Sequence, residues 1–236
     1  MVLYAAVFAV TLGLCLYAVV RYLRHDRQAM VLAFIILMAA VSSWELLNFL
    51  VDAATTEQLK LLGKNAVNAV VYPVYVYGVL ALALVYTNNE RWVGLVVAGC
   101  AVQIVVTGAA LVVAPELLYE SHGLVTRGPF TVAGVTVDQF VTLDRTLEPM
   151  FLLLWVQGQL FVPVAGVILV RYIHQPPRVF VPGQVDAMLV GIGAPLAASF
   201  LLISGAVPPA WNPVDLSFLI TAVAFALAVF RYRLLH

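Results

Sequence analysis

Charged residues are scarce in this sequence. Asp, Glu, Lys and Arg together make up 10% of its 236 residues, whereas an average soluble domain contains about 25%. The 12 basic and 12 acidic side chains give a formal net charge of zero, and they form no basic patch of the kind that binds a nucleic acid. These features exclude a cytosolic enzyme, a disordered chain and a nucleic-acid-binding protein.

Catalytic and metal-binding motifs are also lacking. The two cysteines, Cys15 and Cys100, lie apart within apolar runs, and the four histidines are isolated. No zinc-protease motif and no glycine-rich phosphate loop is present. Both lysines, Lys60 and Lys64, lie far from the last apolar run, which excludes a retinal Schiff base there. We therefore expect no enzyme, no metal and no cofactor in this chain.

Apolar residues dominate instead, at 64% of the chain. A hydrocarbon layer about 30 Å thick takes about 20 helical residues to cross, and only helices and closed barrels can span it. The apolar runs are continuous and about twice as long as a barrel strand. The sequence therefore predicts an all-α, multi-pass protein of the cell membrane, in which a bundle of seven transmembrane helices forms one domain, residues 1–236. The runs cover residues 2–22, 28–51, 66–87, 92–114, 149–171, 184–206 and 213–235.

Basic residues near the helix ends predict the orientation, because cytoplasmic loops are enriched in Lys and Arg. One side of the predicted bundle carries eight arginines, and the other carries two lysines and two arginines. The first side is therefore predicted to be cytoplasmic, with the N-terminus outside and the C-terminus inside. The outer side is net negative, which either favours cations there or reflects ordinary solvated loops. The eight arginines are Arg21, Arg24, Arg27, Arg91, Arg171, Arg178, Arg231 and Arg233.

A long connection, residues 115–148, joins the fourth and fifth predicted helices on the extracellular side. Within it, Phe130–Val132 and Val135–Val137 alternate apolar and hydroxyl residues around an Ala-Gly pair, which predicts a short β-hairpin. Loops of this length are often functional. The hairpin is therefore expected either to cover an outward-facing cavity or simply to pack on the helix ends.

Two neighbouring helices carry polar stripes inside the predicted bilayer. In the second helix, Glu45, Asn48 and Asp52 are spaced i, i+3 and i+7 and share one face. An ionisable group in hydrocarbon is costly, and its default interpretation is functional. The third helix begins with Lys64, so we expect a contact between Glu45 and Lys64. A ligand pocket and a structural ion pair are both compatible with this pattern.

The fifth and seventh predicted helices add further polar groups. Trp155 and Gln159 share one face of the fifth helix. Asp215, at the start of the seventh, is typical of helix capping and dipole stabilisation rather than of a ligand contact. The candidate ligand-binding residues are Trp44, Glu45, Asn48, Lys64, Asn68, Tyr72, Trp155 and Gln159.

Three predicted helices contain an internal proline, namely Pro73, Pro163 or Pro195. An internal proline frees the carbonyl four residues earlier and permits a kink. Such kinks either form a hinge that transmits ligand binding or serve helix packing alone. The freed carbonyls are those of Ala69, Gln159 and Gly191.

Short motifs along the whole chain point to a known family. They are Trp44-Glu45, Lys60 to Lys64, Tyr86-Thr87, His122-Gly-Leu, Gly183–Pro195, Asn212–Phe218 and Ala228–Leu235. Together they resemble the seven-helix N-terminal sensor region of membrane histidine kinases from haloarchaea and bacteria. The resemblance implies that the last helix leads into a cytoplasmic signalling module, in cis or in trans, and it implies a homodimer by analogy. The residues that it assigns to signal output are Arg231, Tyr232 and Arg233.

Two classes of function remain after these observations. The leading hypothesis is a membrane receptor domain that binds an unknown small-molecule or physical stimulus in an outward-facing cavity. Helix seven would then pass a conformational change to a cytoplasmic effector. The alternative is a small membrane transporter or channel, because broken helices such as the one around Pro195 build midplane sites in transporters.

Overall fold

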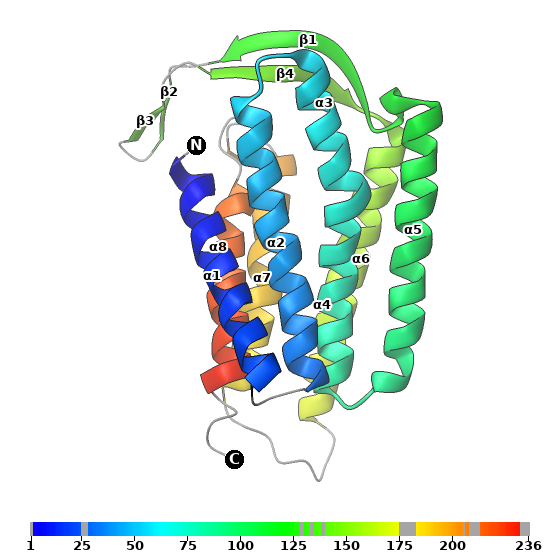
Figure 1. The fold of residues 1–236 in the computed structure, drawn as a ribbon, viewed down its shortest axis with the longest axis vertical. Coiled ribbons are helices and arrows are strands. Elements are labelled where there is room, and N and C mark those ends of the chain that lie inside the picture. Colours follow the sequence, from blue (N-terminus) through cyan, green and yellow to red (C-terminus); the bar gives the residue numbers. More distant parts are fainter. Residues whose placement is uncertain are drawn as a thin grey trace.

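The computed structural model describes residues 2–24, 28–127, 130–132, 135–137, 140–174, 183–204, 206–207 and 213–231. Within these residues, seven helices are long and apolar enough to cross a membrane. They run side by side along the long axis of the molecule (Figure 1). Their helical elements are α1 (Val2–Arg24), α2 (Ala29–Ala53), α3 (Glu57–Ala66), η1 (Val67–Val71), α4 (Tyr72–Tyr86), η2 (Glu90–Trp92), α5 (Val93–Val113), η3 (Pro115–Leu117), α6 (Pro149–Ile173), α7 (Gln184–Ile203), α8 (Pro213–Ala226) and η4 (Leu227–Arg231).

The third span begins earlier than the apolar run suggests, because α3, η1 and α4 form one continuous helix, Glu57–Tyr86. The Thr56 side chain caps its start by accepting a hydrogen bond from the Leu59 amide. Lys60 is buried against the end of α2, where its ammonium donates to the carbonyl of Val51 at 2.8 Å and to that of Asp52 at 3.3 Å. The polar residues before the apolar run therefore belong to the helix. Thr56 caps the start of α3, and Lys60 satisfies carbonyl groups at the end of α2.

The centre of the bundle is α4, which packs against α2, α5 and α6, while α1 packs against α2 and α8 and α7 packs against α8. A single apolar core runs between these helices and includes Phe34, Leu37, Leu82 and Phe225. In contrast, α5 stands at the edge of the bundle (Figure 1), and its apolar side chains are mostly exposed. That arrangement suits a helix whose outer surface faces lipid.

The prolines inside the helices are accommodated in two different ways. The π-helix η1 lies directly before Pro73, and its ladder shifts so that the Tyr72 amide donates to the Val67 carbonyl. In α7, Pro195 frees the carbonyl of Gly191, and the Thr221 hydroxyl of α8 donates to that oxygen at 2.8 Å. A freed carbonyl in the middle of a membrane helix is thus satisfied by the neighbouring helix.

The connection between α5 and α6 contains four strands: β1 (Tyr119–Arg127), β2 (Phe130–Val132), β3 (Val135–Val137) and β4 (Phe140–Leu147). β1 pairs antiparallel with β4, and β2 pairs antiparallel with β3. The Ala133-Gly134 pair between β2 and β3 lies outside the described residues. The paired strands β1 and β4 lie across one end of the bundle (Figure 1), which we call the hairpin end.

The base of this connection is fixed to the helices. Leu118 is fully buried against Leu154, and its carbonyl accepts a hydrogen bond from the Glu148 amide at 3.2 Å. The Ser121 hydroxyl of β1 donates to the carboxylate of Glu57 on α3. These contacts hold the start of β1 against the ends of α3 and α6.

Candidate functional site

A cavity of about 500 Å³ lies between the helices, on the side of the bundle away from α1 and α5. Residues of α2, α3, η1, α4, α6, α7 and α8 line it. It extends from Asn48 and Lys64 toward Val162 and Pro195, which lie deeper in their helices. This volume falls within the range of sites for small organic ligands.

Seven of the eight residues that the sequence nominated line this cavity, namely Trp44, Asn48, Lys64, Asn68, Tyr72, Trp155 and Gln159. The eighth, Glu45, is fully buried but lies outside the lining. Adjacent residues point about 100° apart around a helix, so Trp44 faces the cavity while Glu45 faces another part of the core. The structure therefore brings Asn48 of the α2 stripe together with Lys64 and Asn68 of the next span around one space, and it leaves Glu45 outside that space.

The polar end of the cavity is built by Asn48, Lys64 and Asn68. The Lys64 ammonium donates to the Asn48 side-chain oxygen at 2.7 Å, and the Asn68 amide donates to the Lys64 carbonyl at 2.7 Å. The expected Glu45–Lys64 contact is not a hydrogen bond, because neither carboxylate oxygen of Glu45 has a hydrogen-bond partner in the described part of the chain. Lys64 instead reaches the amide one helical turn further along the same face of α2.

A buried acidic cluster lies behind Trp44. The Trp44 indole nitrogen donates to a carboxylate oxygen of Asp215 at 3.2 Å, and the Tyr4 hydroxyl also hydrogen-bonds this carboxylate. Asp215 is 1% exposed, and it interacts electrostatically with Glu45 and Lys64. Asp215 lies in the first turn of α8, as expected for dipole stabilisation, yet its carboxylate also forms part of the wall behind the cavity.

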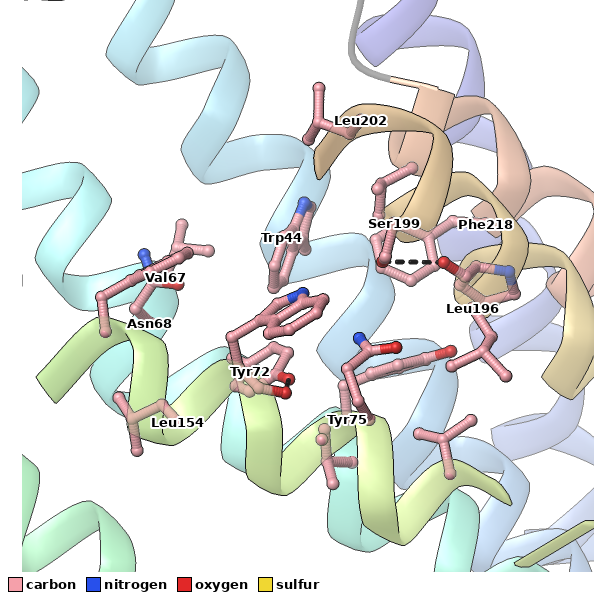
Figure 2. Close-up of a pocket in the computed structure, with 18 of the residues that line it drawn as sticks. Trp44, Val67, Asn68, Tyr72, Tyr75, Leu154, Leu196, Ser199, Leu202 and Phe218 are labelled. Atoms are coloured by element: carbon pink, nitrogen blue, oxygen red, sulfur yellow. Dashed lines mark hydrogen bonds between the residues drawn. The ribbon is translucent and has the colours of Figure 1, made fainter. Parts of the chain in front are cut away.

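Six aromatic side chains contribute to the cavity walls, and Trp44, Tyr72, Tyr75 and Phe218 are among those labelled in Figure 2. The Phe218 ring centroid lies 5.4 Å from that of Trp44 and 5.1 Å from that of Tyr75, both in edge-to-face geometry. Trp44 also lies 6.2 Å from Tyr72, with its ring plane tilted by 50°. Edge-to-face pairs contribute about 0.5–1.5 kcal/mol each beyond the burial of their area, so they favour this arrangement of Trp44, Tyr75 and Phe218.

Two polar oxygens in the lining have no hydrogen-bond partner among the described residues, the Tyr75 hydroxyl and the Gln159 side-chain oxygen. Ser199, by contrast, donates to the Pro195 carbonyl of its own helix at 2.8 Å (Figure 2). Buried polar groups are normally paired. The two unpaired oxygens are therefore positions where a ligand can gain a hydrogen bond.

Close approach of α4 and α6 depends on Gly158. A Cβ atom at this position would collide with the Tyr72 hydroxyl, which donates to the Trp155 carbonyl at 3.4 Å. Tyr72 can therefore lie flat against α6 and form part of the cavity wall.

Several lining residues were not nominated from the sequence, including Tyr75, Leu196, Ser199 and Phe218. The faces of α6 and α7 that line the cavity consist mostly of apolar residues, as do the faces turned to lipid, so composition does not separate them. The π-turn η1 contributes Val67 and Asn68 to the wall. Pro73, which follows η1, predicts a local distortion of the helix. It does not predict the extra residue per turn that changes the direction of the later side chains.

At the opposite end of the bundle, side chains from several helices hold the π-helix η4. The Gln184 amide donates to the Ala228 carbonyl at 2.7 Å, and the Tyr86 hydroxyl donates to Gln184 at 3.2 Å. The Phe230 ring packs against Tyr17, with the Arg21 guanidinium 5.2 Å from its centroid. The backbone of Arg231 ends the described part of η4, and Tyr232 and Arg233 lie outside the described residues.

Across the residues that the structure describes, no group of three or more His, Cys, Asp or Glu side chains has a geometry suited to a metal ion. The residues that line the cavity can contact a ligand through hydrogen bonds, aromatic rings and the Lys64 ammonium.

Comparison with known proteins identifies the family. No curated protein matches the chain at a significant level. A family model described as the N-terminal 7TM region of histidine kinase matches residues 3–236. Seven apolar spans in the described residues agree with that description, and the protein is a multi-pass membrane protein. Since the match covers nearly the whole sequence, the chain belongs to the family of N-terminal seven-transmembrane regions of histidine kinases.

Proposed function

We propose that this chain is a sensor input domain that binds its stimulus in the aromatic cavity and signals through α8. The observation that carries the proposal is that α8 takes part in both ends of this path. Its residues Val214 and Phe218 line the cavity, and the helix continues without interruption into η4. A change in the cavity can therefore move the output end of the same helix.

The orientation that we propose places the hairpin end outside the cell and the Arg21 end in the cytoplasm. Arg21, Arg24, Arg91 and Arg171 lie in α1, η2 and α6 near the connections at the Arg21 end, in keeping with the enrichment of basic residues in cytoplasmic loops. The N-terminus is then extracellular, and the β1–β4 connection is an extracellular loop. The cavity lies in the outer half of the bundle, where it can receive an extracellular or membrane-borne stimulus.

A coupled movement of α7 and α8 gives the transmission step. Pro195 and Phe218 both line the cavity, and the bond from Thr221 to the Gly191 carbonyl joins the two helices one turn away. A ligand that presses on either residue displaces the pair together. If the ligand binds one arrangement about 100-fold more tightly than the other, the equilibrium shifts by about 2.7 kcal/mol, which is enough to invert a modest initial preference.

In this proposal, a cytoplasmic signalling module responds to movements of η4 and of the output residues Arg231, Tyr232 and Arg233. The module belongs to the same polypeptide (in cis) or to a partner protein (in trans). The family is that of histidine kinases, and a homodimer of the sensor region is the assembly that we propose by analogy with kinase dimers. The sensor region spans residues 1–236 as one domain.

A fusion of this chain to a histidine-kinase reporter tests the proposal. Ser199 lines the cavity, so Ser199→Phe fills part of it, whereas Val190 on the same helix is 54% exposed and Val190→Phe adds the same ring on the lipid-facing surface. We expect Ser199→Phe to change the basal kinase output and Val190→Phe to leave it unchanged. Equal output from the two variants, at equal amounts in the membrane, would refute a sensing role for the cavity.

A further inference from the structure

The cavity presents ring faces and edges to whatever it binds. Trp44, Tyr72, Tyr75, Trp155 and Phe218 all line it, and two of these rings, Trp44 and Tyr75, pack against Phe218. Aromatic faces carry negative electrostatic potential and attract ammonium groups, most strongly in surroundings that exclude water. A lining with this many rings therefore favours a ligand with a positive centre beside an apolar group.

The charges around the cavity favour the same sign. Glu45 and Asp215 are 0% and 1% exposed, and each interacts electrostatically with Lys64. Both acids lie within electrostatic reach of Lys64, which already donates to Asn48. Burial disfavours the charged form of an acid, and a nearby positive charge favours it. A cationic ligand therefore gains from these acids on the side of the cavity where Trp44 hydrogen-bonds Asp215.

The unpaired polar atoms in the lining are oxygens. The Tyr75 hydroxyl and the Gln159 side-chain oxygen can each accept a hydrogen bond, and neither has a partner in the described residues. An ammonium group with N–H bonds donates up to three hydrogen bonds and accepts none. A primary or secondary ammonium can donate to both oxygens. A carboxylate can accept from the Tyr75 hydroxyl, but it leaves the Gln159 oxygen unpaired and adds a negative charge.

The surface at the hairpin end also favours cations. Among the residues of segments 52–64 and 115–148 whose side chains the structure describes, five are acidic and two are basic. One of the two basic residues, Lys60, is buried against carbonyl groups of α2. An excess of negative charge near the mouth of a site raises the local concentration of cations and the rate at which they bind.

We propose that the cavity binds a small organic ammonium cation with an apolar body, its positive centre held near Trp44 and Phe218 and its N–H groups donated to Tyr75 and Gln159. This inference rests on the proposed sensor function, because it names the chemical class of the stimulus. The acids Glu45 and Asp215 set the preference for positive charge, and the rings of the wall contact the apolar body.

The test uses three probes of nearly the same shape at neutral pH: phenethylammonium, the uncharged 2-phenylethanol and the anion 3-phenylpropionate. Radiolabelled phenethylammonium is measured by equilibrium dialysis against the whole chain in lipid nanodiscs, with empty nanodiscs as background and the other two compounds as competitors. A ligand of this size has a Kd of a few millimolar or less. We expect phenethylammonium to bind at least about tenfold more tightly than the alcohol and the anion to compete least.

Charge-removing variants assign the preference to the acidic cluster. Asp215→Asn keeps an oxygen that can accept the Trp44 hydrogen bond, and Glu45→Gln changes a side chain that makes no hydrogen bond among the described residues. Each is expected to weaken phenethylammonium binding about tenfold while changing 2-phenylethanol binding less than about threefold. Asp186→Asn is the matched control, because Asp186 is exposed in the first turn of α7 and takes no part in the acidic cluster. If Asp215→Asn does not fold, as judged by size-exclusion chromatography, Glu45→Gln decides the result.

Three results would overturn the inference: no saturable binding of the cation, binding of the alcohol or the anion that is as tight as that of the cation, or an unchanged preference in the folded charge-removing variants. These results are separate from a failure of the sensor proposal, which is measured by the kinase output of Ser199→Phe. For example, if the anion binds most tightly and Ser199→Phe abolishes its binding and changes the kinase output, the preference for a cation is refuted. The cavity then remains the proposed sensing site.

Discussion

The hydrogen bond from Thr221 to the Gly191 carbonyl allows a quantitative test of how α7 and α8 are joined. Pro195 has no amide hydrogen to donate to this carbonyl, and Thr221 donates to it at 2.8 Å from a fully buried position. Replacing Thr221 by Val keeps the shape of the side chain and removes the donor. Interhelical hydrogen bonds in membranes contribute about 0.6 kcal/mol on average and about 1.7 kcal/mol at most. Because no backbone donor replaces the lost one, we expect a destabilisation of about 1–1.7 kcal/mol.

The assay is reversible unfolding in mixed micelles by titration with a denaturing detergent, followed by circular dichroism. Thr107→Val is the matched control, because Thr107 is also buried, lies on α5, and makes no hydrogen bond to another helix within the described residues. An unfolding free energy of Thr221→Val within about 0.5 kcal/mol of that control would refute the view that this bond holds the broken part of α7 to α8.

Three further predictions concern packing, output and the alternative function. Gly191→Ala places a Cβ atom 2.9 Å from the Phe225 ring of α8 and should destabilise the bundle by about 1–3 kcal/mol. The control is Gly193→Ala, which has open space around its Cβ position and should leave the stability unchanged. Equal unfolding free energies for the two variants would contradict this prediction. Gln184→Leu removes the 2.7 Å hydrogen bond to the Ala228 carbonyl of η4 and should change the basal output of the kinase fusion. Asp186 is exposed on the same helix, so Asp186→Asn should leave this output unchanged. Identical outputs from the two variants would argue against η4 as the output element. Proteoliposomes containing the chain should show only background flux of ions and amines, and saturable uptake that Ser199→Phe abolishes would favour a transporter.

Local chemistry made part of this structure predictable. The length and continuity of the apolar runs correspond to seven spanning helices, and the spacing of Asn48 in α2 and Asn68 in the next span placed both in one cavity wall. The effect of Pro195 followed from covalent geometry alone, since a proline must free the carbonyl of Gly191. What satisfies that carbonyl, Thr221, depends on the packing of α8 and could not be derived from the sequence.

Other features depend on tertiary packing or on helical phase. The π-helix Val67–Val71 changes the direction of the side chains that follow it, and nothing in the sequence of these five residues indicates a π-helix rather than an α-helix. Glu45 and Trp44 are neighbours in sequence, yet only Trp44 lines the cavity. The sequence predicted a role in helix capping and dipole stabilisation for Asp215; its burial and the hydrogen bond that it accepts from Trp44 of α2 depend on tertiary packing.

The central claim is that the state of the cavity determines the position of η4. A pair of spin labels can report this directly, one at Leu227 of η4 and one at Leu95 of α5, which are 38% and 65% exposed. The native cysteines, Cys15 and Cys100, are first replaced by alanine. α5 is the reference because no described residue of it lines the cavity.

Pulsed electron paramagnetic resonance in nanodiscs then measures the distance between the two labels in three proteins. The first has an unchanged cavity, the second has a phenyl ring inside the cavity (Ser199→Phe), and the third has the same ring on the outer surface of α7 (Val190→Phe). The account predicts that Ser199→Phe shifts the distance distribution by about 1–2 Å, the size of a typical helix shift in a signalling transition, and that Val190→Phe does not. The same distribution in all three proteins would contradict coupling between the cavity and the output end of the last helix.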